Sequence, residues 1–124
     1  MIIPNWNGRD DLPACLDSLR GQSVPVDVVV VENGSTDGSL EMLRASYPEV
    51  TVLVQPINLG FAGGVNVGLR YAMHRGHSFV ALLNNDAVAA PVDGGAPRRD
   101  GARRRVGMVA SFFVTIDGER IDST

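Results

Sequence analysis

Short runs of β-branched and leucine residues alternate along this chain with longer stretches that carry apolar residues at helical spacing. The runs at residues 26–31 and 50–54 contain almost no polar alternation, which is typical of strands covered on both faces. A parallel sheet flanked by helices provides such cover, so the pattern predicts an α/β domain with the order β-α-β-α-β-α-β. Ligands of such sheets bind outside the carboxyl ends of the strands, and the loops that follow strands are therefore the first place to look for function.

The same pattern predicts where the individual elements lie. Strands are expected at residues 1–4, 26–31, 50–54 and 79–83. Three helices are expected between them, with their apolar faces formed by Leu12, Leu16 and Leu19, by Leu40, Leu43 and Tyr47, and by Phe61, Val65, Leu69 and Ala72. The residues expected at the helix ends are Asp10 and Asp11, then Thr36 or Asp37 as a cap, and Gly21, Pro48 and Gly76 as stops.

Composition limits the class of protein. A chain of 124 residues can bury one core without disulfides, and the net charge of −3 argues against a general nucleic-acid binder. The single Cys15 cannot form an internal disulfide, which favours the cytosol over an oxidising compartment. No signal-peptide pattern is visible, and no run approaches the ~18 apolar residues of a membrane span. We therefore expect a cytoplasmic protein with no nucleic-acid partner and no transmembrane segment, and the sequence leaves its oligomeric state open.

Three polar loops follow the predicted strands: PNWNG at residues 4–8, ENGSTDGS at 32–39 and NND at 84–86. In the second loop, Glu32 or Asn33 could meet the base or ribose of a nucleoside, much as an acid at a strand end binds ribose in dinucleotide folds. Ser35, Thr36 and Asp37 equally suit a helix cap, and the loop alone leaves both interpretations open.

The NND loop ends in Asp86, a hard oxygen ligand at the end of the fourth predicted strand. Mg²⁺ or Mn²⁺ that already carries a diphosphate often needs only one or two protein carboxylates. Asp is also common in turns for purely structural reasons, so Asp86 becomes a metal candidate only through its neighbours.

Four glycines in NLGFAGGVNVG, residues 58–68, open the third predicted helix. The spacing fails the G-x-G-x-x-G fingerprint of nicotinamide-dinucleotide binding, and a chain without Lys has no P-loop. The glycines would let backbone approach a ligand or let the helix pack tightly on the sheet, and both remain open for Gly64 and Gly68. A flavodoxin-like or dinucleotide-using redox domain would need a phosphate loop after the first strand, which PNWNG does not supply.

Four segments together, IIPNWNG, VVVVENGSTDGS, INLGFAGGVNVGLRYA and FVALLNNDA, resemble in order and spacing the family 2 glycosyltransferases of the GT-A fold. They are most similar to the bacterial rhamnosyltransferase-like branch, which works on cell-surface polysaccharides. The resemblance covers residues 2–91 and resumes at 106–123. It implies a Rossmann-like GT-A nucleotide-sugar-binding half, with a mostly parallel sheet flanked by helices.

The resemblance also implies which residues meet a nucleoside-diphosphate sugar, dTDP- or UDP-linked. Asp86 matches the last carboxylate of the family's Asp-x-Asp motif and would hold Mg²⁺ or Mn²⁺, while Asn84 stands where that motif often has its first Asp. Glu32 stands where Asp is more usual. The residues implied to contact or border the donor are Pro4, Asn5, Trp6, Glu32, Asn33, Asp37, Asn58, Gly60, Gly63, Asn66, Asn84 and Asn85.

The reaction implied by the resemblance is direct displacement of a nucleoside diphosphate from the anomeric carbon, with inversion, by a glycan or lipid-linked acceptor. Such an acceptor would place the protein in the cytoplasm or at the inner face of the membrane. The family's general base is a carboxylate of a later, acceptor-binding half and is expected beyond residue 124. The chain is therefore expected to be one truncated donor-binding domain, residues 1–124, and the alternative is a catalytically inactive nucleotide-binding fragment.

The chain contains 11 Arg residues and no Lys, and five of the Arg residues lie between Arg98 and Arg105. Residues 91–105 also hold three glycines and two prolines and show no apolar stripe. We expect a flexible Arg/Gly/Pro-rich insertion at residues 92–105 and a further strand from Val106.

Overall fold

The computed structural model describes residues 1–89, 113–114 and 120–121. Its centre is a parallel sheet in the order β1-β2-β3, formed by β1 (Ile2–Asn5), β2 (Val29–Asn33) and β3 (Thr51–Gln55). The helices are α1 (Leu12–Arg20), α2 (Ser39–Ser46) and α3 (Gly60–His74). A separate antiparallel pair joins β4 (Phe113–Val114) to β5 (Arg120–Ile121). The predicted α/β fold with a parallel sheet is confirmed.

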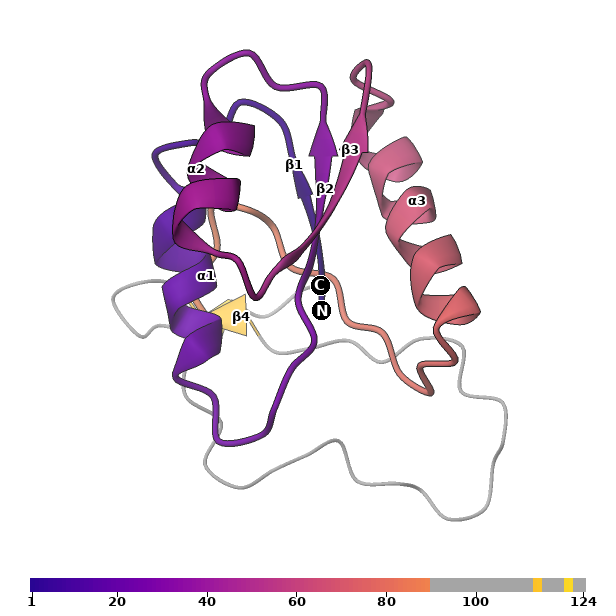
Figure 1. Ribbon diagram of the computed structural model, residues 1–124. Coiled ribbons are helices and arrows are strands. Elements are labelled where there is room, and N and C mark those ends of the chain that lie inside the picture. Colours follow the sequence, from indigo (N-terminus) through magenta and orange to yellow (C-terminus); the bar gives the residue numbers. More distant parts are fainter. Residues whose placement is uncertain (90–112, 115–119, 122–124) are drawn as a thin grey trace.

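The sheet lies between two layers of helix, with α1 and α2 on one face and α3 on the other (Figure 1). Successive residues of a strand point to opposite faces, so Ile3 and Val30 pack with α1 and α2 while Ile2 and Val31 pack with α3. All four side chains are at most 1% exposed. This two-sided burial is the reason that the strands read as continuous apolar runs.

Helix α3 meets the sheet through small residues. Its buried positions are Gly64, Val65, Gly68 and Ala72. Phe61 was predicted on the buried face, and this prediction is wrong, because Phe61 lies in the first turn and is 61% exposed. The helix packs on the sheet through its later turns, where glycines allow a close approach.

Residues 79–83 were predicted to form a strand, and this prediction is wrong, although the segment does run along β1. A single parallel bridge joins Leu82 to Ile2, with Ile2 N–H donating to the Ala81 carbonyl at 2.8 Å and Leu83 N–H donating to the Ile2 carbonyl at 3.0 Å. Phe79 is 59% exposed, so its side chain adds little burial to hold the segment extended. The segment therefore runs beside β1 and delivers the NND loop to the edge where β1 ends.

Two expected boundaries also differ. Strand β2 begins at Val29 rather than at residue 26 and continues to Asn33. The cap of α2 is Gly38, with φ of 88°, rather than Thr36 or Asp37, since a left-handed turn there lets Asp37 bond the first helical residue instead. Residues 92–105 and the start of the strand expected from Val106 lie outside the described residues.

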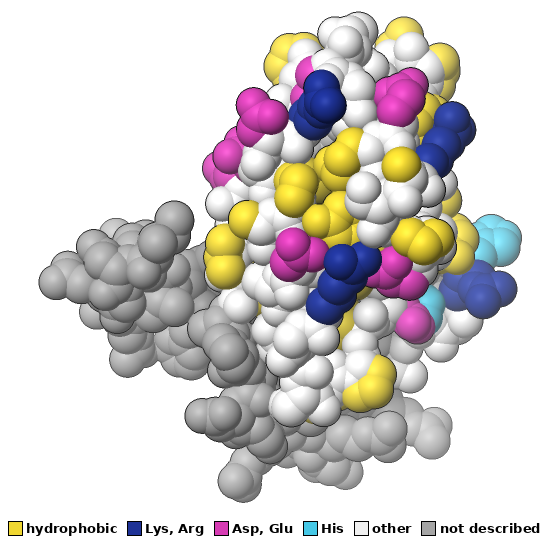
Figure 2. Space-filling view, turned by 60° about the vertical axis from the view of Figure 1, so that its left-hand side comes forward, with side chains coloured by type: hydrophobic (Ala, Val, Ile, Leu, Met, Phe, Trp, Pro, Cys, Tyr) yellow, Lys and Arg dark blue, Asp and Glu magenta, His cyan; other side chains and the backbone are white. Residues whose placement is uncertain are grey.

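Figure 2, turned so that α1 and α2 come forward, shows Arg side chains beside Asp and Glu side chains, with hydrophobic side chains gathered between them. Arg20 of α1 pairs with Asp17 at 3.1 Å and with Glu49 at 2.6 Å. Its guanidinium also lies 4.5 Å from the centre of the Tyr47 ring. In the part of the chain that the structure describes, no helix is long and apolar enough to cross a bilayer.

Candidate functional site

The carboxyl ends of the strands gather the polar loops that the sequence singles out. Asn5 ends β1, Asn33 ends β2, and the NND loop follows the segment that runs beside β1. Because the strands are parallel, these ends meet at one edge of the sheet, at the top of Figure 1. The structure therefore brings together residues that are as far as 80 positions apart in the sequence.

A chain of hydrogen bonds crosses this edge. The side-chain amide of Asn85 donates to Asn5 Oδ1 at 2.9 Å, and the Asn5 amide donates in turn to Glu32 Oε2 at 2.7 Å. The other carboxylate oxygen of Glu32 accepts the Ser35 N–H at 3.0 Å. Asn5 and Glu32 are each 1% exposed. We call Asn85, Asn5 and Glu32 the polar relay, which joins the NND loop to the loop after β2.

A second set of bonds fastens the loop after β1 to the loop after β2. Asn7 N–H donates to the Ser35 hydroxyl at 2.8 Å, and Asn7 Oδ1 accepts the Thr36 N–H at 2.9 Å. Asp37 accepts the Arg9 N–H at 2.9 Å. The two loops that were predicted to face a nucleoside thus form one connected surface.

Asp37 serves as the anchor of that surface. Its Oδ1 also accepts the backbone N–H and the hydroxyl of Ser39 at the start of α2. Burial opposes the charged form, but the hydrogen bonds from the Ser39 hydroxyl and from the Arg9 and Ser39 amides hold the pKa of Asp37 below its ordinary value. The cap interpretation and the site position of Asp37 are therefore compatible.

The glycine-rich turn before α3 is held by Asn33. The amide of Asn33 donates to Asn58 Oδ1 at 3.0 Å and to the Gly60 carbonyl at 3.1 Å, while its Oδ1 accepts the Leu59 N–H at 3.1 Å. Asn58 Oδ1 further accepts the Gly60 N–H at 2.8 Å. Asn33 is 3% exposed, so its side chain fixes the turn from inside the protein rather than facing solvent.

The turn that carries Asp86 is fastened to α1. The Cys15 thiol donates to the Asn84 carbonyl at 3.5 Å, and Ala89 N–H donates to the Ser18 hydroxyl at 2.9 Å. Cys15 is fully buried, and this burial, with the nearby Asp86 charge adding to it, raises the pKa of the thiol to about 11. Cys15 is therefore a protonated donor that holds the turn.

The chemistry of the turn suits a cation that arrives with its own ligands. Asp86 is exposed, while the Asn85 amide is used by the polar relay and the Asn84 carbonyl by Cys15. Among the described residues no three His, Cys, Asp or Glu side chains group together as metal ligands. One free carboxylate fits Mg²⁺ or Mn²⁺ bound to a diphosphate, which needs few protein ligands.

The remaining predicted site residues divide by exposure. Pro4, Gly63 and Asn85 are partly buried along the same edge. The exposed ones, which a ligand could reach without rearrangement, are Trp6, Asn58, Gly60, Asn66, Asn84 and Asp86. The structure thus places the buried candidates Asn5, Glu32 and Asn33 beneath the surface that the exposed ones form.

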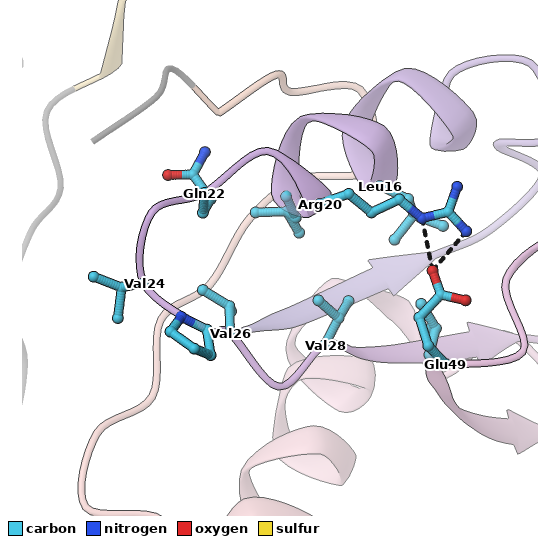
Figure 3. A pocket seen from close by; sticks show the side chains of 10 residues that line it. Leu16, Arg20, Gln22, Val24, Val26, Val28 and Glu49 are labelled. Carbon is cyan, nitrogen blue, oxygen red and sulfur yellow. Dashed lines mark hydrogen bonds and ion pairs between the residues drawn. The ribbon is translucent and has the colours of Figure 1, made fainter. Parts of the chain in front are cut away.

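Two hollows of the described part of the chain lie elsewhere. One, of about 260 Å³, is lined by Leu16, Val26 and Val28, with the Arg20–Glu49 pair at its rim (Figure 3). The other, of about 400 Å³, also includes Val26 and Val28 and reaches His77. Both sit where β2 begins, at the amino ends of the strands. We favour the carboxyl edge as the site, since the polar groups converge there and ligands of such sheets bind there.

Three residues of the site were not predicted. Asn7 has a left-handed φ of 51°, a conformation that Asn tolerates better than most residues and that a turn such as N-W-N-G could have suggested. Ser18 carries no sequence signal, because its partner Ala89 lies 71 positions away. At Gly8 a Cβ would lie 2.1 Å from Asn85 Nδ2 and 2.5 Å from Asn5 Oδ1, so a glycine is required where the relay crosses the loop.

A family model matches most of the chain. The model described as Glycosyl transferase family 2 matches residues 1–93, which include every site residue named above. The uncharacterized glycosyltransferase YibD of Escherichia coli (strain K12) is 33% identical over 95 residues, which is 73% of this chain and 26% of that protein. The undecaprenyl-phosphate mannosyltransferase of Micrococcus luteus is 31% identical over 93 residues, 73% of this chain and 38% of that protein.

Solved structures share the fold. The crystal structure of S. aureus TarS 1–349 in complex with UDP superposes with a TM-score of 0.61 and 29% sequence identity, over 70% of this chain and 27% of that one. The chain thus spans between about a quarter and two-fifths of the length of these relatives.

Proposed function

This chain belongs to glycosyl transferase family 2, and from that premise we propose that its sheet edge binds the nucleoside-diphosphate sugar that serves as glycosyl donor. The observation that carries the proposal is the meeting of the ends of β1 and β2 with the NND loop. The polar relay joins the loop after β2 to the NND loop, and the exposed Asp86 follows directly. A nucleoside is bound by polar side chains and backbone N–H groups, and a diphosphate is bound through a cation that a carboxylate holds. This edge carries the polar loops for the first and the Asp86 carboxylate for the second.

The proposed roles follow from exposure. The surface formed by the loops after β1 and β2, with Trp6 and Asp37, would receive the nucleoside, while Asn58, Gly60, Gly63 and Asn66 would border the sugar. Asp86, with Asn84 beside it, would hold Mg²⁺ or Mn²⁺ on the diphosphate. Bound there, the cation would neutralise the charge that develops on the leaving diphosphate, a contribution of several kcal/mol by the general behaviour of such ions.

The reaction proposed is transfer with inversion. An acceptor hydroxyl oxygen forms the new bond to the anomeric carbon as the bond from that carbon to the diphosphate oxygen breaks, and a general base takes the hydroxyl proton. The base is expected beyond residue 124, as in the acceptor-binding half that the sequence resemblance implies. The chain's own contribution is to orient the donor so that the anomeric carbon faces the acceptor.

The donor and acceptor are proposed by class. TarS is described in complex with UDP, which supports a pyrimidine nucleotide, UDP- or dTDP-linked. The resemblance to the rhamnosyltransferase-like branch supports a deoxysugar donor and a cell-surface polysaccharide product. The named substrate class of the Micrococcus luteus relative supports a lipid-linked acceptor, which would place the reaction in the cytoplasm at the inner face of the membrane.

Isothermal titration calorimetry tests the proposal. UDP, UDP-GlcNAc and dTDP are titrated into the chain with Mn²⁺ and again with EDTA, and ATP serves as a negative control. We expect UDP or dTDP to bind at least tenfold more tightly with Mn²⁺, and Asp86→Ala to remove this difference. The matched control is Asp27→Ala, an exposed carboxylate where β2 begins, whose side chain is 84% exposed. Absence of nucleotide binding, or equal behaviour of the two variants, would overturn the assignment.

A turnover assay tests whether this chain catalyses transfer by itself. The chain is incubated with UDP-GlcNAc or dTDP-rhamnose, Mn²⁺ and undecaprenyl phosphate, and glycolipid is followed by mass spectrometry. Because the general base is expected beyond residue 124, we expect nucleotide binding without product, and formation of glycolipid would show that the chain already contains a base.

A further inference from the structure

We propose that the polar relay of Asn85, Asn5 and Glu32 makes nucleoside binding and cation binding energetically dependent on each other, with Glu32 acting as a positioning residue. The inference rests on the proposed function, since it concerns the same donor site. It differs from the role that the sequence suggests for Glu32, which is direct contact with the nucleoside. Glu32 is 1% exposed, and each of its carboxylate oxygens already accepts a hydrogen bond from the protein.

The relay has a fixed direction. A carboxylate only accepts, so Glu32 forces the Asn5 amide to present Nδ2 toward it and Oδ1 toward Asn85. Asn85 must then present its own Nδ2, which fixes its side chain next to Asp86. Flipping any one amide would set two donors or two acceptors against each other, at a cost comparable to a lost buried hydrogen bond. The orientation of the NND loop therefore depends on the position of Glu32.

The other end of Glu32 fixes the nucleoside loop. Its Oε1 accepts the Ser35 N–H, and Ser35 in turn accepts the Asn7 N–H that fastens the loop after β1. A nucleoside that orders the loops at Ser35 and Asn7 thus orders the Asp86 turn, and a cation on Asp86 does the reverse, since such coupling is reciprocal.

Gly8 shows how closely the relay is enclosed. A Cβ at Gly8 would overlap both the Asn85 amide and Asn5 Oδ1, so Gly8→Ala would separate these two groups without altering any polar atom of the relay. This offers a steric variant beside the chemical ones.

The first experiment tests the direction of the relay without ligand. In Glu32→Gln, the orientation of the new amide that satisfies the Ser35 N–H sets its own N–H group against Asn5 Nδ2. This clash is relieved only if the Asn5 and Asn85 amides both flip, which reverses the relay. Asn85→Asp alone sets a carboxylate against Asn5 Oδ1. In the double variant every group has a partner again. The new amide at position 32 donates to Asn5 Oδ1, and the Asn5 amide donates to the new carboxylate at position 85, so the side-chain hydrogen bonds run in the opposite direction.

We therefore expect Asn85→Asp to lower the folding equilibrium constant roughly tenfold in urea titrations, Glu32→Gln to lower it less, and the double variant to recover most of the loss caused by Asn85→Asp. Additive losses in the double variant would overturn the relay. Gln55→Ala, an amide at the end of β3 that donates to its neighbour Val54, is the matched control and should show no coupling with Asn85→Asp.

The second experiment measures coupling between ligands, which a purely structural role would not produce. Uridine carries no phosphate and cannot touch the cation, so any effect of Mg²⁺ on its affinity passes through the protein. In ¹⁵N-edited NMR titrations we expect Mg²⁺ to tighten uridine binding about fivefold in the unmodified chain and in Gln55→Ala. Gly8→Ala, which separates Asn85 from Asn5, should bind uridine with no dependence on Mg²⁺.

The outcomes separate the two proposals. If UDP with Mg²⁺ binds but uridine affinity does not respond to Mg²⁺, or if Gly8→Ala keeps the full response, the coupling is overturned and the donor site stands. If neither nucleotide nor nucleoside binds, the proposed function fails together with the coupling, while the urea experiment still decides whether the relay orients the loops.

Discussion

Gly68 of α3 lies directly against Ile2 of β1, so closely that a Cβ on the glycine would sit 2.5 Å from Ile2 Cγ2. Ile2 is 1% exposed and pairs with Val29 on one side and with Leu82 on the other. It therefore links the sheet to the segment that carries the NND loop. The close approach of α3 is part of what fixes that segment, which settles the packing interpretation for Gly68.

Gly68→Ala should destabilise the protein. Overpacking costs about 1–3 kcal/mol in general, and the better helix propensity of Ala returns less than about 1 kcal/mol. We expect a net loss of about 1–2 kcal/mol in the free energy of unfolding, measured by urea titration. Gly21→Ala is the control, because its nearest non-neighbouring atom would be 3.9 Å away, and it should change stability by less than about 0.5 kcal/mol. Equal stability of the two variants would contradict the packing.

Cys15 should react slowly with alkylating agents while the protein is folded. Its pKa of about 11, raised from 9.0, lowers the thiolate fraction near pH 8. The two-unit shift corresponds to about a hundredfold less thiolate, before burial slows access further. Iodoacetamide labelling followed by mass spectrometry measures this directly. Labelling of the native chain as fast as of the urea-unfolded chain would show that the thiol is not held at Asn84.

The same shift predicts a loss of stability at alkaline pH. The folded state keeps the Cys15 proton at pH values where the unfolded state releases it, so this contribution is complete below pH 9.0 and falls as the pH rises toward 11. Cys15→Ala should flatten that part of the curve in urea titrations. An identical slope in both proteins would be evidence against a buried, protonated thiol.

Asp37 should stabilise the folded protein at neutral pH and lose this contribution at acid pH. Its folded pKa lies below the ordinary 3.8, because hydrogen bonds from Ser39 and Arg9 outweigh the effect of burial. The contribution is therefore present above pH 3.8 and lost as the pH falls through the folded pKa. Acid unfolding followed by circular dichroism should show this component in the unmodified chain. Asp37→Asn should lack it, and matching acid profiles would contradict the anchor role.

Asn33→Asp should loosen the glycine-rich turn. The change removes both N–H donors of the side chain and sets a carboxylate against Asn58 Oδ1 and the Gly60 carbonyl. A buried polar group left without partners costs about 1–3 kcal/mol, so we expect a loss in that range and faster hydrogen exchange at Leu59 N–H. The control is Asn66→Asp, an exposed position of α3, which should leave that exchange rate unchanged. An unchanged hydrogen-exchange rate at Leu59 N–H in Asn33→Asp would show that Asn33 does not hold the glycine-rich turn.

The sequence predicted the three-stranded core and the helices because large apolar residues mark them. It placed Val65 and Ala72 of α3 correctly on the buried face. It wrongly added Phe61 to that face and left the contact role of Gly64 and Gly68 open, since the pattern weighs large side chains. It also predicted a full strand at residues 79–83, where apolar content is high but only Leu82 pairs with β1. Both errors concern interactions that depend on a distant partner.

For the site, the sequence predicted which loops would meet but not what their residues do there. Glu32 and Asn33 stand in a polar loop and read as ligand contacts, yet the structure buries both and uses their polar atoms internally. Ser18 and Gly8 each depend on a partner more than 70 positions away, Ala89 for Ser18 and Asn85 for Gly8. The local sequence pattern identifies which loop residues are polar. Hydrogen bonds to residues far away in the sequence decide which of these polar residues hold the loops in place and which stay exposed to a ligand.

A ¹⁵N-edited NMR titration with UDP and Mg²⁺ tests the central claim, that the nucleotide binds at the carboxyl edge of the sheet. The expected result is a set of shifts confined to the amides of Asn7, Gly8, Ser35, Thr36, Gly60 and Asp86. The hollows at the opposite edge provide the internal comparison. Shifts concentrated at Val26, Val28 and His77, with the carboxyl edge unchanged, would contradict the account.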